Sequence, residues 1–174
     1  MNFLVLAAQL DQEERVVEAA WAYERAIATG QAELAAFLDL AVLYFYATDF
    51  GMLSHHHLSD GFAQAAWERS FQVLDEAEQR FGPNTEIAFW RRYFPYVRLG
   101  EPPFVEECEA IASTGSSLVP YFHLYAASGG DVHREQAAEL YKAVKPARTS
   151  RQRWIKNVLD SPALPPPMLG GDQT

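Results

Sequence analysis

The residues whose types and spacing could do chemistry are, first, three consecutive histidines: His55, His56 and His57. Adjacent imidazoles can bind Zn²⁺ or Ni²⁺ loosely, but a defined site needs ligands that aim at one point, as at positions i and i+4 of a helix. Because consecutive side chains diverge, we interpret the triplet as part of a polar surface loop. Incidental metal binding and a metal-dependent enzyme are the alternatives. We predict no metal and no cofactor.

A nucleophile is the second possibility, and Cys108 is the only cysteine. Its neighbours Glu106, Glu107 and Glu109 disfavour the thiolate, so we predict a half-buried helix residue rather than a reactive thiol. A single cysteine also excludes an internal disulfide, which is typical of a reducing, cytoplasmic compartment. The short apolar run near the start of the chain has no Lys or Arg before it, which favours a first helix over a secretory signal.

Sequence motifs of catalysis are missing from the chain. There is no serine elbow between a strand and a helix, no phosphate-binding loop, no dinucleotide fingerprint and no His-Glu-x-x-His pattern. We therefore predict that the protein is not an enzyme.

The charge of the 174-residue chain points to a basic partner. Residues 1–87 carry 14 acidic and 4 basic side chains, whereas residues 88–174 carry 9 acidic and 10 basic ones. An acidic chain is a poor binder of nucleic acid or anionic lipid, because affinity for phosphate comes from basic side chains. No apolar run approaches the ~20 residues that span a bilayer. We predict a basic protein partner, and neither nucleic acid nor membrane.

A run of basic residues lies near the end of the chain without an intervening acidic residue. One interpretation is a solvated helical face. The other is that this segment binds an acidic surface, such as the acidic half of this chain in a dimer. The run consists of Lys142, Lys145, Arg148, Arg151, Arg153 and Lys156.

The elements that must position these residues are helices. Apolar residues recur at three- and four-residue steps, and no alternating strand pattern occurs, so we predict an all-α fold. Residues 1–160 form one helical domain, and the Pro- and Gly-rich residues 161–174 form an extended tail. The pattern predicts helices over 13–29, 32–47, 59–81, from Ile87 to a kink or end near Pro95, and at about 103–112, 117–127, 132–144 and 149–159.

The four tryptophans fall within these apolar patterns, so we predict that they belong to the core rather than to a binding surface. They are Trp21, Trp67, Trp90 and Trp154.

Two neighbouring helices combine small and aromatic residues at spacings that resemble a tetratricopeptide repeat. The resemblance covers about residues 13–46; later copies depart from the 34-residue period of that family. It implies antiparallel helix pairs in a short solenoid, and an irregular helical array is the alternative. The matching residues are Ala19, Tyr23 and Ala26, followed by Phe37, Leu40, Ala41 and Tyr44.

The same resemblance implies protein–protein interaction through a concave face lined by the first helix of each pair. In size and charge the chain also resembles bacterial immunity proteins, which occlude a cognate toxin. A chaperone or adaptor that binds clients or peptides is the alternative, and an enzyme that uses the histidine loop is the third hypothesis. The predicted partner-binding residues are Leu38, Asp39, Val42, Phe45 and Tyr46 on the face, with Asp49, His55, His56, His57 and Asp60 in or beside the loop.

Overall fold

The computed structural model describes residues 1–49, 51 and 56–161. Every regular element in these ranges is a helix, so the all-α prediction is confirmed. The predicted tail, apart from Ser161, lies outside the described residues. The helices are α1 (Phe3–Gln12), α2 (Val16–Ala28), α3 (Leu34–Tyr46), α5 (Asp60–Phe81), α6 (Thr85–Leu99), α7 (Val105–Ser113), α8 (Pro120–Ala127), α9 (Arg134–Val144) and α10 (Ser150–Asp160).

Side-chain caps define where several helices begin. The Ser59 hydroxyl accepts a hydrogen bond from the Phe62 backbone amide at 3.1 Å and so caps α5. Asn2 caps α1 and Asn84 caps α6 in the same way. Thr149 caps α10 by accepting from the Gln152 amide. Each cap satisfies a backbone donor that the first turn of a helix leaves without a partner.

Helix α6 continues through Pro95 and ends at Leu99, so of the two predicted outcomes, a kink or an end near Pro95, the end is wrong. Proline removes one backbone hydrogen bond from a helix, but packing on both sides of it compensates for that loss. Phe94 is fully buried, and Tyr96 and Val97 pack against the core beyond the proline. The helix stops instead at Gly100, whose φ of 66° suits the left-handed C-terminal cap.

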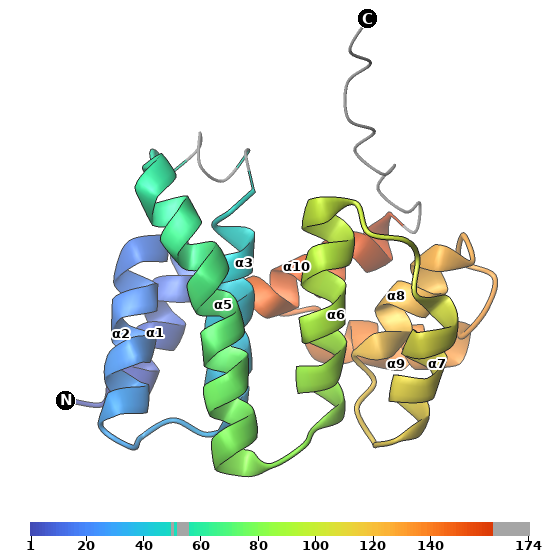
Figure 1. Cartoon of the computed structure of the whole chain (residues 1–174), viewed down its shortest axis with the longest axis horizontal. Helices are drawn as coiled ribbons and strands as arrows, with labels where there is room; N and C mark the ends of the chain where they lie inside the picture. The colour runs from blue at the N-terminus through green and yellow to red at the C-terminus, as the bar shows by residue number, and fades with distance from the viewer. Residues whose placement is uncertain (50, 52–55, 162–174) are drawn as a thin grey trace, which may run out of the picture.

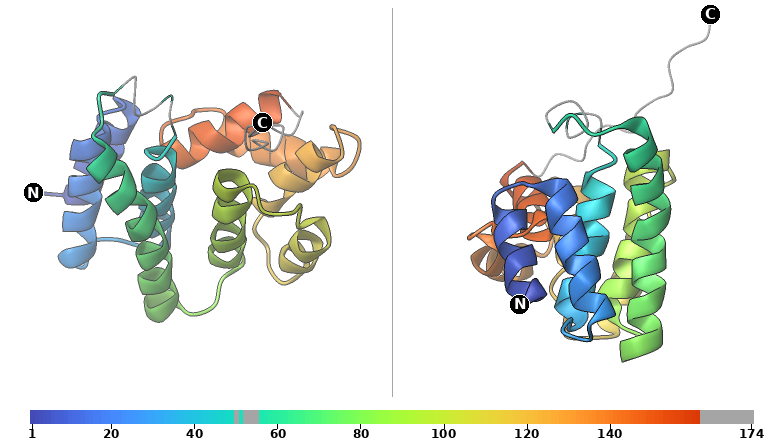
Figure 2. Two further views of the ribbon diagram at one scale, coloured as in Figure 1. Left: turned by 45° about the horizontal axis from the view of Figure 1, so that its top comes forward. Right: turned by 90° about the vertical axis from the view of Figure 1, so that its left-hand side faces the viewer.

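The helices form an irregular array in which antiparallel neighbours pack in pairs (Figure 1). Helix α1 packs most extensively on α2, and α3 on α5. Helix α6 follows beside α5, and α7, α8 and α9 form the other end of the molecule (Figure 1). The last helix, α10, returns to pack against α3, α8 and α9. It lies on the side of α3 opposite α5 (Figure 2).

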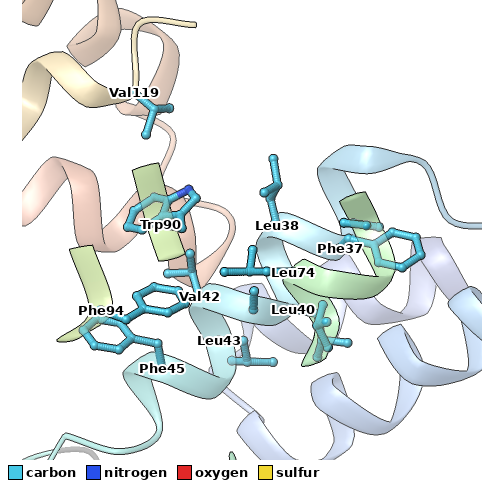
Figure 3. Packing of buried hydrophobic residues seen from close by; sticks show 14 of the residues in the cluster. Phe37, Leu38, Leu40, Val42, Leu43, Phe45, Leu74, Trp90, Phe94 and Val119 are labelled. Atoms are coloured by element: carbon cyan, nitrogen blue, oxygen red, sulfur yellow. The ribbon is translucent and has the colours of Figure 1, made fainter. Parts of the chain in front are cut away.

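The core is centred on α3, which is covered on most of its faces, as its apolar composition predicts (Figure 3). Phe45 of this helix stacks on Phe94 of α6 with ring centroids 4.4 Å apart. All but one of the residues that carry the repeat resemblance are buried, and Tyr44 is half-buried. Small residues at these positions let neighbouring helices approach closely.

The tryptophans are not all in the core. Trp90 is fully buried, and Trp67 and Trp154 are half-buried against it. Trp21 is 53% exposed, so its assignment to the core is wrong. The inner side of α2 is filled by small residues and Tyr23, which leaves Trp21 on the outer side, where its ring meets that of Phe3 edge-on.

Candidate functional site

The inner side of the array, formed by α1, α3 and α6, is covered by the chain's own C-terminal helix, α10. We call this surface the α10-binding face and define it by the residues that contact α10 through hydrogen bonds, ion pairs or ring contacts. They are Asp11, Asp39, Phe45, Tyr46, Glu86 and Tyr93.

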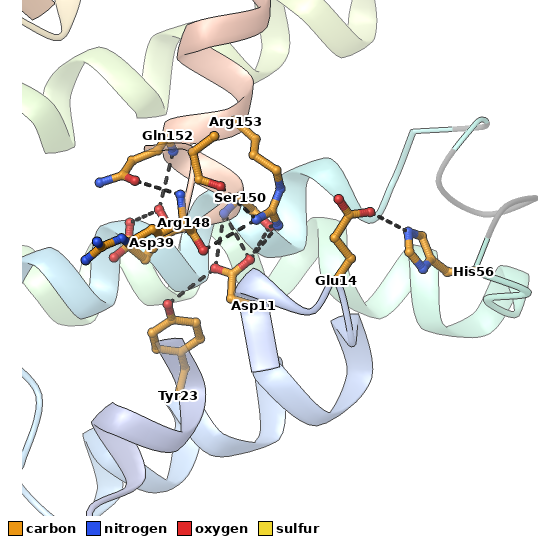
Figure 4. Close-up of polar contacts among 11 residues, drawn as sticks. Asp11, Glu14, Tyr23, Asp39, His56, Arg148, Ser150, Gln152 and Arg153 are labelled. Carbon is orange, nitrogen blue, oxygen red and sulfur yellow. Dashed lines mark hydrogen bonds and ion pairs between the residues drawn. The ribbon is translucent and has the colours of Figure 1, made fainter. Parts of the chain in front are cut away.

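Asp11 is the most buried polar group of this face (Figure 4). Its carboxylate accepts hydrogen bonds from the Ser150 backbone amide at 2.9 Å and from the Ser150 hydroxyl at 2.7 Å. Arg153 forms an ion pair with it at 2.7 Å, and the Tyr23 hydroxyl donates at 3.3 Å. Burial raises the pKa of Asp11, and the contacts with Ser150 and Arg153 oppose that rise. Asp11 therefore connects α1 to the start of α10.

Asp39 and Glu86 hold the other side of α10. The Arg151 Nε atom lies 2.8 Å from Asp39 Oδ1, and its Nη1 atom lies 2.8 Å from Glu86 Oε2. Thr149 also donates to Asp39, at 3.1 Å, and Ser117 donates to the free oxygen of Glu86. One guanidinium thus joins α3, α6 and α10, and all three charged side chains are at most 17% exposed.

Trp154 completes the contact with an aromatic cluster. Its indole N–H donates to the Tyr93 hydroxyl at 3.2 Å. The rings of Phe45 and Tyr46 meet the indole edge-on, with centroids 5.1 Å and 5.6 Å away. On this face, carboxylates pair with arginines and aromatic rings pack against a tryptophan. These are the contacts by which a protein recognises a basic amphipathic helix.

The predicted partner-binding residues of α3 do not line an open face. Leu38, Val42 and Phe45 are at most 3% exposed in this structure, and their assignment as partner-binding residues stays a prediction. They are buried because the core and α10 cover the face that the repeat resemblance leaves open. Asp39 and Tyr46 do reach the inner side, but they contact Arg151 and Trp154 of this chain.

The loop residues form a separate region at the adjoining ends of α3 and α5. Asp49, His57 and Asp60 are exposed, as expected of a surface loop. His56 is partly buried, with its Nε2 atom 3.8 Å from Glu14 (Figure 4). His55 lies outside the described residues. Among the described residues, no group of three or more His, Cys, Asp or Glu side chains could hold a metal ion.

An open cavity of about 690 Å³ lies beside Arg151. It lies between the first turn of α6 and the loop before α8, with the end of α9 and one side of α10 as its other walls. Glu86 and Arg151 are its charged lining residues, and they are paired with each other.

Two residues outside these regions could in principle carry chemistry. Cys108 is fully buried, and burial followed by the charges of Glu109 and Glu107 raises its pKa to about 12, which favours the unreactive thiol. His123 is also buried, and burial together with the charge of Arg92 lowers its pKa to about 4. It is surrounded by aromatic rings, the nearest that of Phe104. Neither residue adjoins a group that it could activate.

Sequence reasoning missed Asp11, Glu86 and the position of α10. The basic run contains both arginines that contact the face, and they pair with the acidic half within the same chain. Asp11 could have been identified from the sequence, because it is the single charged residue of the otherwise uncharged helix α1. A lone carboxylate in such a segment indicates a buried partner.

No family model, no curated protein and no solved structure matches this chain. In the part of the chain that the structure describes, none of the helices has both the length and the apolar character to cross a bilayer.

Proposed function

We propose that this chain is a non-enzymatic interaction module that binds a basic protein through its acidic half. The observation behind this proposal is the distribution of unpaired carboxylates. Most acidic side chains of residues 1–87 are in ion pairs, but Glu33, Asp49, Asp60 and Glu68 are exposed and form none among the described residues. Glu33 stands alone at the start of α3, whereas the other three lie closer together. Asp49, Asp60 and Glu68 lie at and near the adjoining ends of α3 and α5.

Exposed carboxylates of one sign attract a basic partner over distance and speed the encounter. The nearby His57 is exposed as well and adds hydrogen-bonding groups. We therefore assign this contact to Asp49, His57 and Asp60.

Within this class, we propose an immunity-type protein that binds one toxin or effector and occludes it. Size, acidity and the helical fold support this narrower proposal, which rests on analogy rather than on a motif. The second candidate is an adaptor that binds peptides or clients. The observation that favours it is the α10-binding face, which already holds a helix.

A charge-reversal experiment tests the proposal. The wild type and the Asp49→Lys/Asp60→Lys variant capture proteins from the native cell lysate at low and high salt, and mass spectrometry identifies them. We expect one basic protein in one-to-one yield with the wild type and at least about tenfold less with the variant, because the steering charge is reversed.

The matched control is Glu106→Lys/Glu135→Lys. These residues are exposed, begin other helices and change the net charge by the same amount. Loss of capture in the control as well would indicate a nonspecific charge effect and contradict the proposed site. Equal capture by all three proteins, or no captured protein at either salt, would overturn it. A spread of unrelated clients would favour the adaptor.

A further inference from the structure

Helix α10 contacts the rest of the protein in the manner of a bound ligand. Only Ser150 and Ile155 of its eleven residues are buried, whereas α3 buries eight. Trp154, Val158 and Leu159 are half-buried against the core, and α10 also packs on α8 and α9. Towards α1, α3 and α6, its hydrogen bonds and ion pairs come from Ser150, Arg151, Arg153 and Trp154. Polar contacts of this kind resemble an interface more than a hydrophobic core.

The α10-binding face is complementary to a specific spacing of side chains in α10. Arg151 and Arg153 are two residues apart, so they lie about 200° apart around a helix. The face matches this arrangement, because Asp11 lies on one side of α10 while Asp39 and Glu86 lie on the other. Trp154 then fits between the two carboxylate groups, against the aromatic cluster. The recognised pattern is Arg-x-Arg-Trp at the start of a helix.

The attachment of α10 also favours exchange with a competitor. Buried ion pairs add little net stability, since desolvation of the charges offsets most of their attraction. The Arg153 Nε atom is buried without a hydrogen-bond partner among the described residues. In the connection from α9, Ala147 has a φ of 50°, a left-handed conformation that a residue with a side chain rarely adopts. Release of α10 would relieve this strain.

We infer that the α10-binding face is a docking surface for an arginine-bearing amphipathic helix of the partner, which takes the place of α10. The inference rests on the proposed function, because it supposes a basic partner. It assigns that partner a second contact, on the opposite side of α3 from α5.

Binding of a synthetic peptide tests the inference. The probe is a fluorescein-labelled peptide with the sequence of residues 148–161, and fluorescence anisotropy measures its affinity for the full chain. We expect weak binding to the wild type, because α10 occupies the face. The Arg151→Gln/Arg153→Gln variant should bind the peptide at least about tenfold more tightly, since its own helix competes less well.

Two controls make the result specific. The Arg148→Gln/Lys156→Gln variant removes the same charge from residues that have no ion pair with the face, so it should bind like the wild type. A peptide with glutamine in place of Arg151 and Arg153, and with Arg148 kept, should lose at least about tenfold in affinity for the Arg151→Gln/Arg153→Gln variant. Equal binding of both peptides, or no gain in that variant, would overturn the inference.

Hydrogen exchange of the wild type keeps the inference testable if the variant does not fold. Amides of α10 should exchange at least about tenfold faster than those of α3, because α10 opens without global unfolding. Equal protection of the two helices would show that α10 does not leave the face. Neither experiment uses the natural partner. A negative result in them therefore overturns this inference but not the proposed function, and a negative charge-reversal result overturns the proposed function but not the peptide binding.

Discussion

Asp11 and His123 are both buried polar side chains, but they differ in whether their polar atoms have hydrogen-bond partners. Asp11 has no exposed surface, but its carboxylate accepts from Ser150, Arg153 and Tyr23. His123 is equally buried, stacks on Phe104 at 4.5 Å, and leaves Nε2 without a partner among the described residues. An unsatisfied buried group costs stability, and a charged one costs more. His123 therefore has to remain neutral for the fold to hold.

This requirement predicts a pH dependence of stability. The folded pKa of His123 is about 4, below the ordinary value of 6.5, so the unfolded chain binds the proton first as pH falls. Stability from this group is complete above about pH 6.5 and is lost as pH falls toward 4. Between pH 7 and pH 5 the loss should be about 2 kcal/mol.

Urea unfolding at both pH values checks the prediction, with His123→Phe as the comparison. Phenylalanine keeps a ring beside Phe104 but does not titrate. The variant should lose about 2 kcal/mol less than the wild type over this interval. An identical loss in both proteins would mean that the titrating groups lie elsewhere.

At the scale of elements, α10 decides whether the inner side of the array is open or closed. Its cap contacts α3, Arg153 contacts α1, and Arg151 and Trp154 each contact both α3 and α6. The single residue Asp11 receives both the first backbone amide of α10 and an arginine one turn later. Asp11 should therefore matter far more to stability than a carboxylate in an exposed ion pair.

We expect Asp11→Ala to cost about 3–5 kcal/mol of unfolding free energy, because it leaves Arg153 and Ser150 unpaired in a buried position. The matched control is Asp75→Ala, which breaks an exposed ion pair with Arg91 and should cost less than about 1 kcal/mol. The double variant Asp11→Ala/Arg153→Met should lose less unfolding free energy than the sum of the losses in the two single variants. Equal costs at Asp11 and Asp75 would show that the connection to α10 is weak.

Most helices were predictable because three- and four-residue periodicity is a local property, as in α5 with its Ser59 cap. The continuation of α6 past Pro95 was not, because packing of residues such as Phe94 outweighs the local cost of proline. The place of α10 was harder still. Its contacts join Asp11 to Arg153 and Asp39 to Arg151, more than a hundred residues apart. In the sequence, only the lone charge of Asp11 in α1 and the uneven charge of the two halves indicated them.

At the scale of the whole molecule, the array has two ends joined by α6 and α10. Buried residues nevertheless form one cluster that runs from Ala7 in α1 to Ile155 in α10. Trp90 lies at its centre and contacts Phe94 of its own helix and Phe122 of α8. A continuous core of this kind favours a single cooperative unfolding transition, which is what one domain over residues 1–160 requires.

Two probes in different parts of the molecule test this cooperativity. Far-UV circular dichroism follows all helices, whereas labelling of the buried Cys108 thiol follows the opening of α7. We expect the two urea midpoints to coincide, because opening of α7 exposes the cluster that also stabilises α3. Trp90→Ala should cost about 3–5 kcal/mol and lower both midpoints together. If Cys108 reacts at a urea concentration where most of the helical signal remains, helices α7 to α9 unfold as a separate unit. The protein would then have two separately unfolding cores, one in α7 to α9 and one in the remaining helices, with α10 packed against both.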